Sequence, residues 1–510
     1  MIYHTKKEYK KSEFIKITSF YFNKKHEQKQ HKTTHYQLFD IILQYYFLVR
    51  TKKSLLYIFA LTILKINRIM ETQKNGNSGE MIELLSKYST ALDNLEDLDP
   101  LIDYIGNAKY VLLGEASHGT HEYYVWRAKI TKRLIQEKGF SFVGVEGDWP
   151  DCYRLNRYAK GYLESEKDIY SVMNEFKRWP TWMWANWETA AFIDWLKAFN
   201  QDIAANKKIG FYGLDVYSFR DSMNSIIEYL EKNDPKALKV AKKAMDCFEP
   251  YGQDEGQSYA RASAFIPELC EKEILHMLTE IRNNALTYNT DIENTMSTEQ
   301  NAFVARNAEK YYRAMIKRGS ASWNIRDEHM VSTIERLMKF HGKEAKIIVW
   351  EHNTHIGDAR ATNMATEGMV NVGQLLREQY ATEGVIAVGF GSYKGSVVAG
   401  REWGDSMRKI KVPEAVTGSW EHALHIAGKG KNRLLLLHKL KNNKNFNSFI
   451  GHRAIGVVYN PEHERFGNYV PTVIPERYDA FLFIDETNAL HPIHIQPEGN
   501  QIPETYPFGM

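Results

Sequence analysis

The stretch KYVLLGEASHGTHE, residues 109–122, contains the pattern on which the fold prediction rests. Its first five residues are almost wholly apolar, and a glycine, a carboxylate and a histidine follow soon after. Continuous apolar runs of this length are typical of strands that helices bury on both faces. The stretch therefore predicts a buried strand with a polar turn at its carboxyl end.

The same unit recurs along the chain. The predicted strands are 109–113, 141–145, 208–212, 346–350, 385–390, 433–437, 454–459 and 480–484. Stretches with helical character lie between most of them. We therefore predict an α/β fold with a mostly parallel, buried sheet and crossover helices.

The third and fourth predicted strands are separated by a long stretch without strand character. Helices are predicted there at 222–232, 236–248, 262–284 and 298–340, which indicates a large helical insertion. The predicted division is a basic leader at 1–79, a first half of the α/β core at 80–218, the helical insertion at 219–342 and the second half of the core at 343–510.

The leader has a composition of its own. Residues 1–69 carry 14 Lys and Arg against 4 Asp and Glu, whereas the rest of the chain is mildly acidic. The apolar run Ser54–Leu64 is too short for a membrane span, which takes about twenty residues. We interpret the leader as disordered or as the product of a mis-assigned start codon, with translation beginning near Met70. The alternative is an anchor on a membrane surface.

Three cysteines, Cys152, Cys247 and Cys270, are scattered without a C-x-x-C pair. This excludes a cysteine zinc site and makes a disulfide framework unlikely, so a cytoplasmic location is expected. The body also lacks the clustered basic and aromatic residues of a nucleic-acid groove. We expect a small-molecule partner, no nucleic acid and no membrane span, and the sequence leaves the oligomeric state open.

Polar residues follow five of the predicted strands at the point where each one ends. The residues are Glu115 and His118; Glu146 and Asp148; Asp215; Glu351, His352 and His355; and Tyr393. Parallel strands bring their carboxyl ends to one edge, and ligands of open α/β sheets bind outside that edge. The sequence therefore predicts one site built from five separate segments.

His118 is the predicted general base of this site. A carboxylate such as Glu115 or Glu146 beside one ring nitrogen fixes the tautomer and raises the basicity of the other nitrogen. Arg127, nine residues after His118, is the expected partner of these carboxylates.

Two other chemistries remain open for the same residues. His352 and His355 have a spacing that suits a metal ion, with Glu115, His118 and Glu146 as further ligands. Ser117 lies in a strand-to-helix turn as a nucleophile would, but G-x-S-x-G is absent and its neighbouring histidine is poorly placed to activate it.

The run WPTWMWANWE, residues 179–188, is unusually dense in tryptophan. Helix packing explains one or two such side chains, and four in nine residues indicate the wall of a pocket for a bulky apolar ligand. Trp182, Trp184 and Trp187 are therefore candidate substrate-binding residues, with Asp148, Asp215 and Tyr393.

With these motifs, the chain from about Met81 to Asp485 resembles the erythromycin esterase family. The resemblance rests on GEASHGTHE, VEGD, the tryptophan run, GFYGLD and EHNTHIGD, in this order. It implies that His118 takes a proton from a water that attacks a lactone ester carbonyl, without a metal or other cofactor. The family positions for Glu115, Arg127, Glu146, His352 and His355 hold the expected residue types. The chain departs from the family pattern at Glu351, where relatives often have a small residue, and in its basic leader.

The resemblance leaves the substrate open, and macrolide resistance does not follow from it. We predict an enzyme that cleaves an ester or lactone, with Glu115 and Glu146 orienting His118 or the water. His352 and His355 are expected to polarise the carbonyl. The alternatives are a metal-dependent hydrolase that uses the same cluster and a non-enzymatic accessory protein of polysaccharide biosynthesis.

Overall fold

A computed structural model describes residues 79–163, 168–252, 256–266, 269–285, 291–316 and 319–494. The predicted leader lies outside the described residues, except for Gly79, where the first described helix begins.

Nine strands form one sheet within the described residues, in the order β1-β8-β11-β6-β2-β5-β3-β4, with β7 paired to β6. All pairings from β11 to β4 in this order are parallel, whereas β8 pairs antiparallel with β11 and β7 pairs antiparallel with β6. The strands of this sheet are β1 Ser89–Ala91, β2 Tyr110–Leu113, β3 Phe142–Val145, β4 Gly210–Gly213, β5 Ile347–Trp350, β6 Val385–Ala399, β7 Arg408–Val412, β8 Arg433–Leu436 and β11 Ala480–Thr487. The predicted α/β fold with a mostly parallel sheet is confirmed.

Helices cover both faces of the sheet, as the continuous apolar runs predict. In β2, Val111 and Leu113 pack into one core while Tyr110 and Leu112 pack into another. The first core is closed by α5 Asp99–Ile105, α6 His121–Lys138 and α9 Trp187–Asn200; the second by α4 Gly79–Tyr88, α15 Ala321–His341, α17 Val372–Tyr380 and α18 Trp420–Gly428. Successive side chains of a strand point to opposite faces, so every residue of β2, β3, β4 and β5 is buried.

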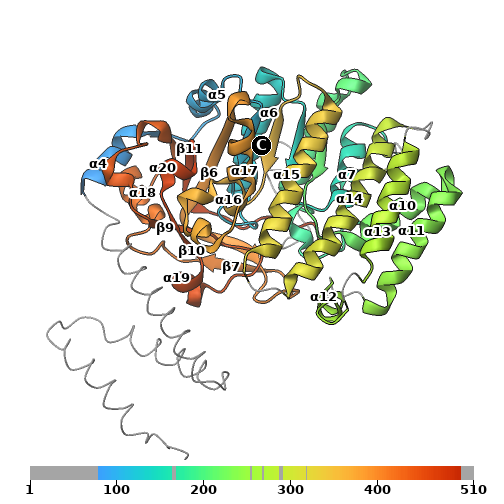
Figure 1. Cartoon of the computed structure of the whole chain (residues 1–510). Helices are drawn as coiled ribbons and strands as arrows, with labels where there is room; N and C mark the ends of the chain where they lie inside the picture. The colour runs from blue at the N-terminus through green and yellow to red at the C-terminus, as the bar shows by residue number, and fades with distance from the viewer. Residues whose placement is uncertain are drawn as a thin grey trace, which may run out of the picture. The chain divides into compact units, whose positions relative to one another are not determined.

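Between β4 and β5 the chain is helical. Figure 1 shows α10, α11, α13, α14 and α15 side by side in this part of the chain. The helices are α10 Phe219–Asn233, α11 Pro235–Phe248, α12 Gln257–Ser263, α13 Glu271–Asn284, α14 Ile292–Met315 and α15. Helices α10 to α14 share an apolar core of their own, whereas α15 also packs on the sheet through Met330 and Ile334. Helix α15 therefore joins the helical insertion to the sheet.

Three sequence predictions need correction here. The predicted helix 298–340 is two helices, α14 and α15, and 262–284 contains the separate helices α12 and α13. The predicted strand 454–459 is not a strand: only bridges at Ile455 and Val458 form there, and the neighbouring strand β9 Ile450–Arg453 pairs with β10 Tyr469–Thr472. Ile455 and Tyr459 of this run are buried in a small cluster with Val397 and Ala399 of β6, so the run has apolar residues without a strand ladder.

The structure also contains one disulfide, which the sequence analysis did not predict. Cys247 at the end of α11 is bonded to Cys270 at the start of α13. The packing of α11 against α13 brings these two cysteines together. The sequence contains no pattern that marks such a tertiary contact, so the pair could not be predicted from the cysteine spacing. Since such bonds persist in oxidising compartments, the cysteines no longer support a cytoplasmic location.

The remaining helices of the described residues are short or lie at the edges of the sheet. They are α7 Trp149–Ala159, α8 Ile169–Met173, α16 Asn353–Ile356, α19 Glu464–Gly467 and α20 Ile474–Arg477. No helix in the described ranges has the length and apolarity that crossing a membrane requires.

Candidate active site

A cavity of about 140 Å³ opens at the carboxyl ends of the parallel strands. Five predicted site residues line it: His118, Glu146, Asp148, Trp184 and Asp215. They follow β2, β3 and β4 or belong to the tryptophan run, so the edge brings together segments that are distant in sequence. The remaining predicted residues are not among the described residues that line this cavity: Glu115, Arg127, His352, His355, Trp182, Trp187 and Tyr393.

The turn after β2 is held tightly against the sheet. The next residue after His118, Gly119, lies so close to the backbone carbonyl of Val398 on β6 that a Cβ atom could not fit. The amide of Val398 donates in turn to the carbonyl of Gly119 at 2.9 Å. A glycine at this position therefore allows the turn to pack directly on β6, which fixes the position of the His118 backbone.

His118 is oriented by a buried chain of charges. Its Nδ1 lies 2.9 Å from Oε1 of Glu115, and Oε2 of Glu115 lies 2.7 Å from Nη2 of Arg127. Arg127 is fully buried, with its guanidinium stacked 4.3 Å from the ring centre of Tyr124. Because Nδ1 faces Glu115, Nε2 is the ring nitrogen that His118 has available for the cavity.

Glu146 is held by Arg326 instead of the expected Arg127. Nη2 of Arg326 donates to Oε1 of Glu146 at 2.6 Å and to Oδ2 of Asp215 at 2.6 Å. The backbone amide of His352 donates to Oε2 of Glu146 at 2.8 Å. Arg127 was expected to pair with both carboxylates, but it pairs with Glu115 alone because α15 supplies a second arginine to the edge.

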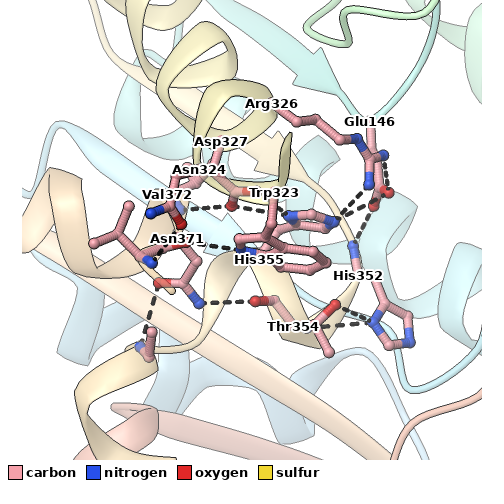
Figure 2. A network of polar contacts seen from close by, with 12 residues as sticks. Glu146, Trp323, Asn324, Arg326, Asp327, His352, Thr354, His355, Asn371 and Val372 are labelled. Atoms are coloured by element: carbon pink, nitrogen blue, oxygen red, sulfur yellow. Dashed lines mark hydrogen bonds and ion pairs between the residues drawn. The ribbon is translucent and has the colours of Figure 1, made fainter. Parts of the chain in front are cut away.

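His355 lies between this arginine and Asp327, as Figure 2 shows. Its Nδ1 is 2.9 Å from Oδ1 of Asp327, and its Nε2 is 3.0 Å from Nη1 of Arg326. The ring stacks on Trp323, with 4.6 Å between the ring centres. Since arginine only donates, Nε2 accepts and Nδ1 carries the proton given to Asp327. His355 thus positions Arg326.

His352 points away from His355 and reaches Glu146 through its backbone amide (Figure 2). Its Nδ1 contacts Oγ1 of Thr354 at 2.8 Å, and its ring lies 4.9 Å from the ring of His118. His352 is therefore a neighbour of the predicted base.

Burial and the charges of the sheet edge shift the pKa values of His118, Glu146 and His352. Burial alone lowers the pKa of His118, but the charge of Glu146 and the hydrogen bond to Glu115 outweigh it and raise the pKa. Burial alone raises the pKa of Glu146, yet the charge of Arg326 and the hydrogen bond from the backbone amide of His352 help to hold that pKa below its ordinary value. Burial and the charge of His118 lower the pKa of His352. The edge thus combines an ionised Glu146, a strengthened base at His118 and a neutral His352.

The mouth of the cavity has a second acidic group. Arg178 donates through Nη2 to Oδ1 of Asp148 at 2.9 Å. Asp151 also lines the cavity, and burial together with the charge of Asp148 raises its pKa to about 7. Asp151 is one turn into α7 and was not predicted.

The tryptophan run contributes less to the cavity than expected. Trp184 lines it and donates from Nε1 to the carbonyl of Glu146 at 2.9 Å. Trp182 is fully buried, and Trp187 stacks on Tyr170. Tyr393 lies within β6, because this strand continues to Ala399 beyond its predicted end. Its ring stacks on His425.

Sequence reasoning missed Arg326 and Asp327, which organise the edge from the second turn of α15. The run NIRDEH, residues 324–329, contained a signal, since charged residues of a long helix need buried partners when the face that carries them packs on a sheet. Their partners are distant in sequence, so the helix could not be assigned to the site without the fold.

The edge does not favour a metal ion at the predicted ligands. Glu115 is paired with Arg127 and Glu146 with Arg326, and guanidinium groups at these distances repel a cation. In the described ranges, the group of three His, Cys, Asp or Glu whose ligand atoms lie within 4.8 Å of one another is His121, Glu188 and His491.

Comparison with known proteins agrees with the fold and the predicted resemblance. The family model for erythromycin esterase matches residues 135–487. The chain belongs to the erythromycin esterase family. The matched range includes Glu146, His352 and His355, whereas Glu115, His118 and Arg127 precede it.

A curated erythromycin esterase type II from Escherichia coli is 23% identical over 362 residues, which are 66% of this chain and 82% of the relative. A crystal structure of a succinoglycan biosynthesis protein has a TM-score of 0.66 at 21% identity and covers 81% of this chain and 98% of its own. A protein from Bacillus cereus has a TM-score of 0.68 at 20% identity, over 82% of this chain and 99% of its own.

A mutant of the erythromycin esterase EreC in its open conformation has a TM-score of 0.55 at 15% identity, over 77% of this chain and 94% of its own. At these identities the solved structures show that the fold is shared, and the chemistry must be argued from the residues of this chain.

Proposed function

We propose that this member of the erythromycin esterase family hydrolyses a carboxylic ester or lactone by direct attack of water, with His118 as the general base. The observation that carries the proposal is the orientation of His118. Glu115 occupies Nδ1, and the ring lines the cavity, so Nε2 is available to a water molecule there.

In this mechanism Nε2 of His118 takes a proton from water, and the hydroxide oxygen bonds to the ester carbonyl carbon. The ionised Glu146 stabilises the imidazolium that forms. The imidazolium then gives its proton to the leaving alkoxide as the carbon–oxygen ester bond breaks. The products are a carboxylic acid and an alcohol, so one water is consumed. No cofactor takes part.

Arg326 is the group that we assign to the carbonyl oxygen. It lines the cavity, and it carries the positive charge that an oxyanion needs. His352 and His355 do not line the cavity among the described residues, so we assign them positioning roles: His355 holds Arg326, and the amide of His352 holds Glu146. Asp148, Asp215 and Trp184 shape the substrate end of the cavity.

Erythromycin is the first substrate to test because of the family. The cavity is smaller than the range of about 300–1,000 Å³ typical of ligand pockets, so small lactones and simple esters belong in the same panel. A role in macrolide resistance depends on the erythromycin arm of this panel.

The test compares wild type, His118→Ala and His276→Ala, with product masses read for the addition of one water. His276 is an exposed histidine on α13 and serves as the matched control. Cleavage by wild type and His276→Ala, but not by His118→Ala, supports the proposal. Failure of wild type on the whole panel supports instead the non-enzymatic role in polysaccharide biosynthesis.

A further inference from the structure

The second histidine of GEASHGTHE has no role in the proposed hydrolysis, yet it belongs to a compact polar cluster. Nδ1 of His121 and Nδ1 of His491 each lie 2.6 Å from the same oxygen, Oε1 of Glu188. The two imidazole rings meet edge to face with 5.3 Å between their centres. Three potential ligand atoms therefore converge on one point.

We propose that His121, Glu188 and His491 form a binding site for a divalent transition metal ion of the Zn²⁺ class. Two imidazole nitrogens and one carboxylate oxygen are a ligand set that zinc accepts, with water in the fourth position. The ligand atoms all lie within 4.8 Å of one another, so small side-chain rotations suffice to reach bond lengths of about 2.0–2.2 Å.

The backbone holds the three ligands in place. The amide of His121 donates to the carbonyl of Asn488 at 2.9 Å, and the amide of Leu490 donates to Gly119 at 3.0 Å. On the other side, the amide of Trp187 donates to the carbonyl of His491 at 3.0 Å. The segment 488–493 thus lies between the His118 turn and the start of α9, and the ligands come from all three segments.

Charge and exposure favour a cation here more than at the sheet edge. Glu188 is buried, and the ion pairs that it makes within the described residues are both with histidines. At the sheet edge, by contrast, arginines occupy Glu115 and Glu146. The His491 side chain is 36% exposed, which leaves an entry path and room for a water ligand.

A metal at this site joins the C-terminal segment to the turn that carries His118, three residues before His121. Its expected effect is on the stability of that turn. The proposed hydrolysis does not pass through the ion, so metal binding and ester cleavage are independent outcomes.

The experiment is a titration of the metal-free full chain with Zn²⁺ by calorimetry, with Co²⁺ visible absorption as a spectroscopic readout of coordination. The matched control is His425→Ala: His425 is 32% exposed and also pairs with a carboxylate, Asp485 at 2.6 Å, but has no second histidine there. His491→Ala removes one ligand, and Glu188→Gln keeps a hydrogen-bond acceptor while removing the anion.

The proposal predicts one tight Zn²⁺ equivalent and a higher Tm with Zn²⁺ for wild type and His425→Ala. His491→Ala and Glu188→Gln are expected to bind at least about 100-fold more weakly. Absence of binding by wild type, or equal binding by His491→Ala, would show that the cluster is a hydrogen-bonded brace and overturn the proposal. Should His491→Ala not fold, the Glu188→Gln titration decides.

Discussion

Nη2 of Arg326 lies 2.6 Å from Oε1 of Glu146, although 180 residues separate the two in the sequence. The contact joins α15, at the end of the helical insertion, to the carboxyl end of β3. The same guanidinium also binds Asp215 after β4. Arg326 therefore organises the edge of the sheet from outside it.

Replacing Arg326 tests this organising role. Arg326→Ala leaves Glu146 and Asp215 without their cation, and we expect kcat to fall by about 100- to 1,000-fold. The free energy of unfolding is expected to fall by about 3 kcal/mol, because two buried carboxylates lose their partner. Arg336→Ala, on the same helix and paired with Glu299 and Gln300, is the matched control. Hydrolysis and denaturant unfolding measure both effects, and a kcat equal to that of the control would contradict the assignment.

The pH dependence of hydrolysis tests the influence of Glu146 on His118. A base must be deprotonated to act, so activity rises as the pH passes the pKa of His118. Because that pKa is raised, the acid limb is expected to have its midpoint above the ordinary histidine value of about 6.5. Glu146→Gln removes the negative charge and should move the midpoint to lower pH.

Glu137→Gln, on the exposed end of α6, controls for a general change of charge in this measurement. The pH dependence of kcat/KM reports the pKa values of the free enzyme, so this quantity is measured from about pH 5 to about pH 9. An acid limb that stays in place in Glu146→Gln would separate the two residues and contradict the electrostatic account.

Glu351, in contrast to the ionised Glu146, is a carboxyl group whose surroundings favour the neutral form. It is fully buried, its oxygens have no hydrogen-bond partner among the described residues, and burial together with the charge of Glu146 raises its pKa well above the ordinary value. Burial and the neighbouring negative charge therefore both favour the neutral form of this carboxyl group. Glu351→Gln should change the free energy of unfolding by less than about 1 kcal/mol and leave kcat within about threefold. A loss comparable to that of Glu146→Gln would mean that Glu351 is ionised.

The disulfide predicts a stability effect confined to the helical insertion. Cys247 and Cys270 are 23 residues apart. The bond lowers the conformational entropy of the unfolded chain, which should raise the free energy of unfolding by about 3 kcal/mol. Cys247→Ser is expected to lower the Tm while ester hydrolysis at 25 °C stays unchanged. Reductant should lower the Tm of wild type to the same value and leave that of Cys247→Ser where it is. An equal Tm for wild type and variant under oxidising conditions would show that the bond contributes nothing.

The sequence predicted the edge of the sheet better than its surroundings. The strands around β2 are short and fully buried, so apolar runs and the polar residues after them were sufficient to locate His118, Glu146 and Asp215. The pattern failed where apolar residues had another cause: in the run 454–459, Ile455 and Tyr459 pack against β6 and β7 without forming a strand. Arg326 and Asp327 escaped prediction because a helix contributes to a site through tertiary packing, which periodicity does not contain.

The most direct test of the account is the rate of ester hydrolysis by wild type and His118→Ala, measured on erythromycin and small lactones by the mass of one added water. The account predicts cleavage by wild type and a rate at least about 1,000-fold lower for a folded His118→Ala, because the base and the position of the water are lost together. A folded His118→Ala that cleaves as fast as wild type would contradict the assignment of His118 as the base.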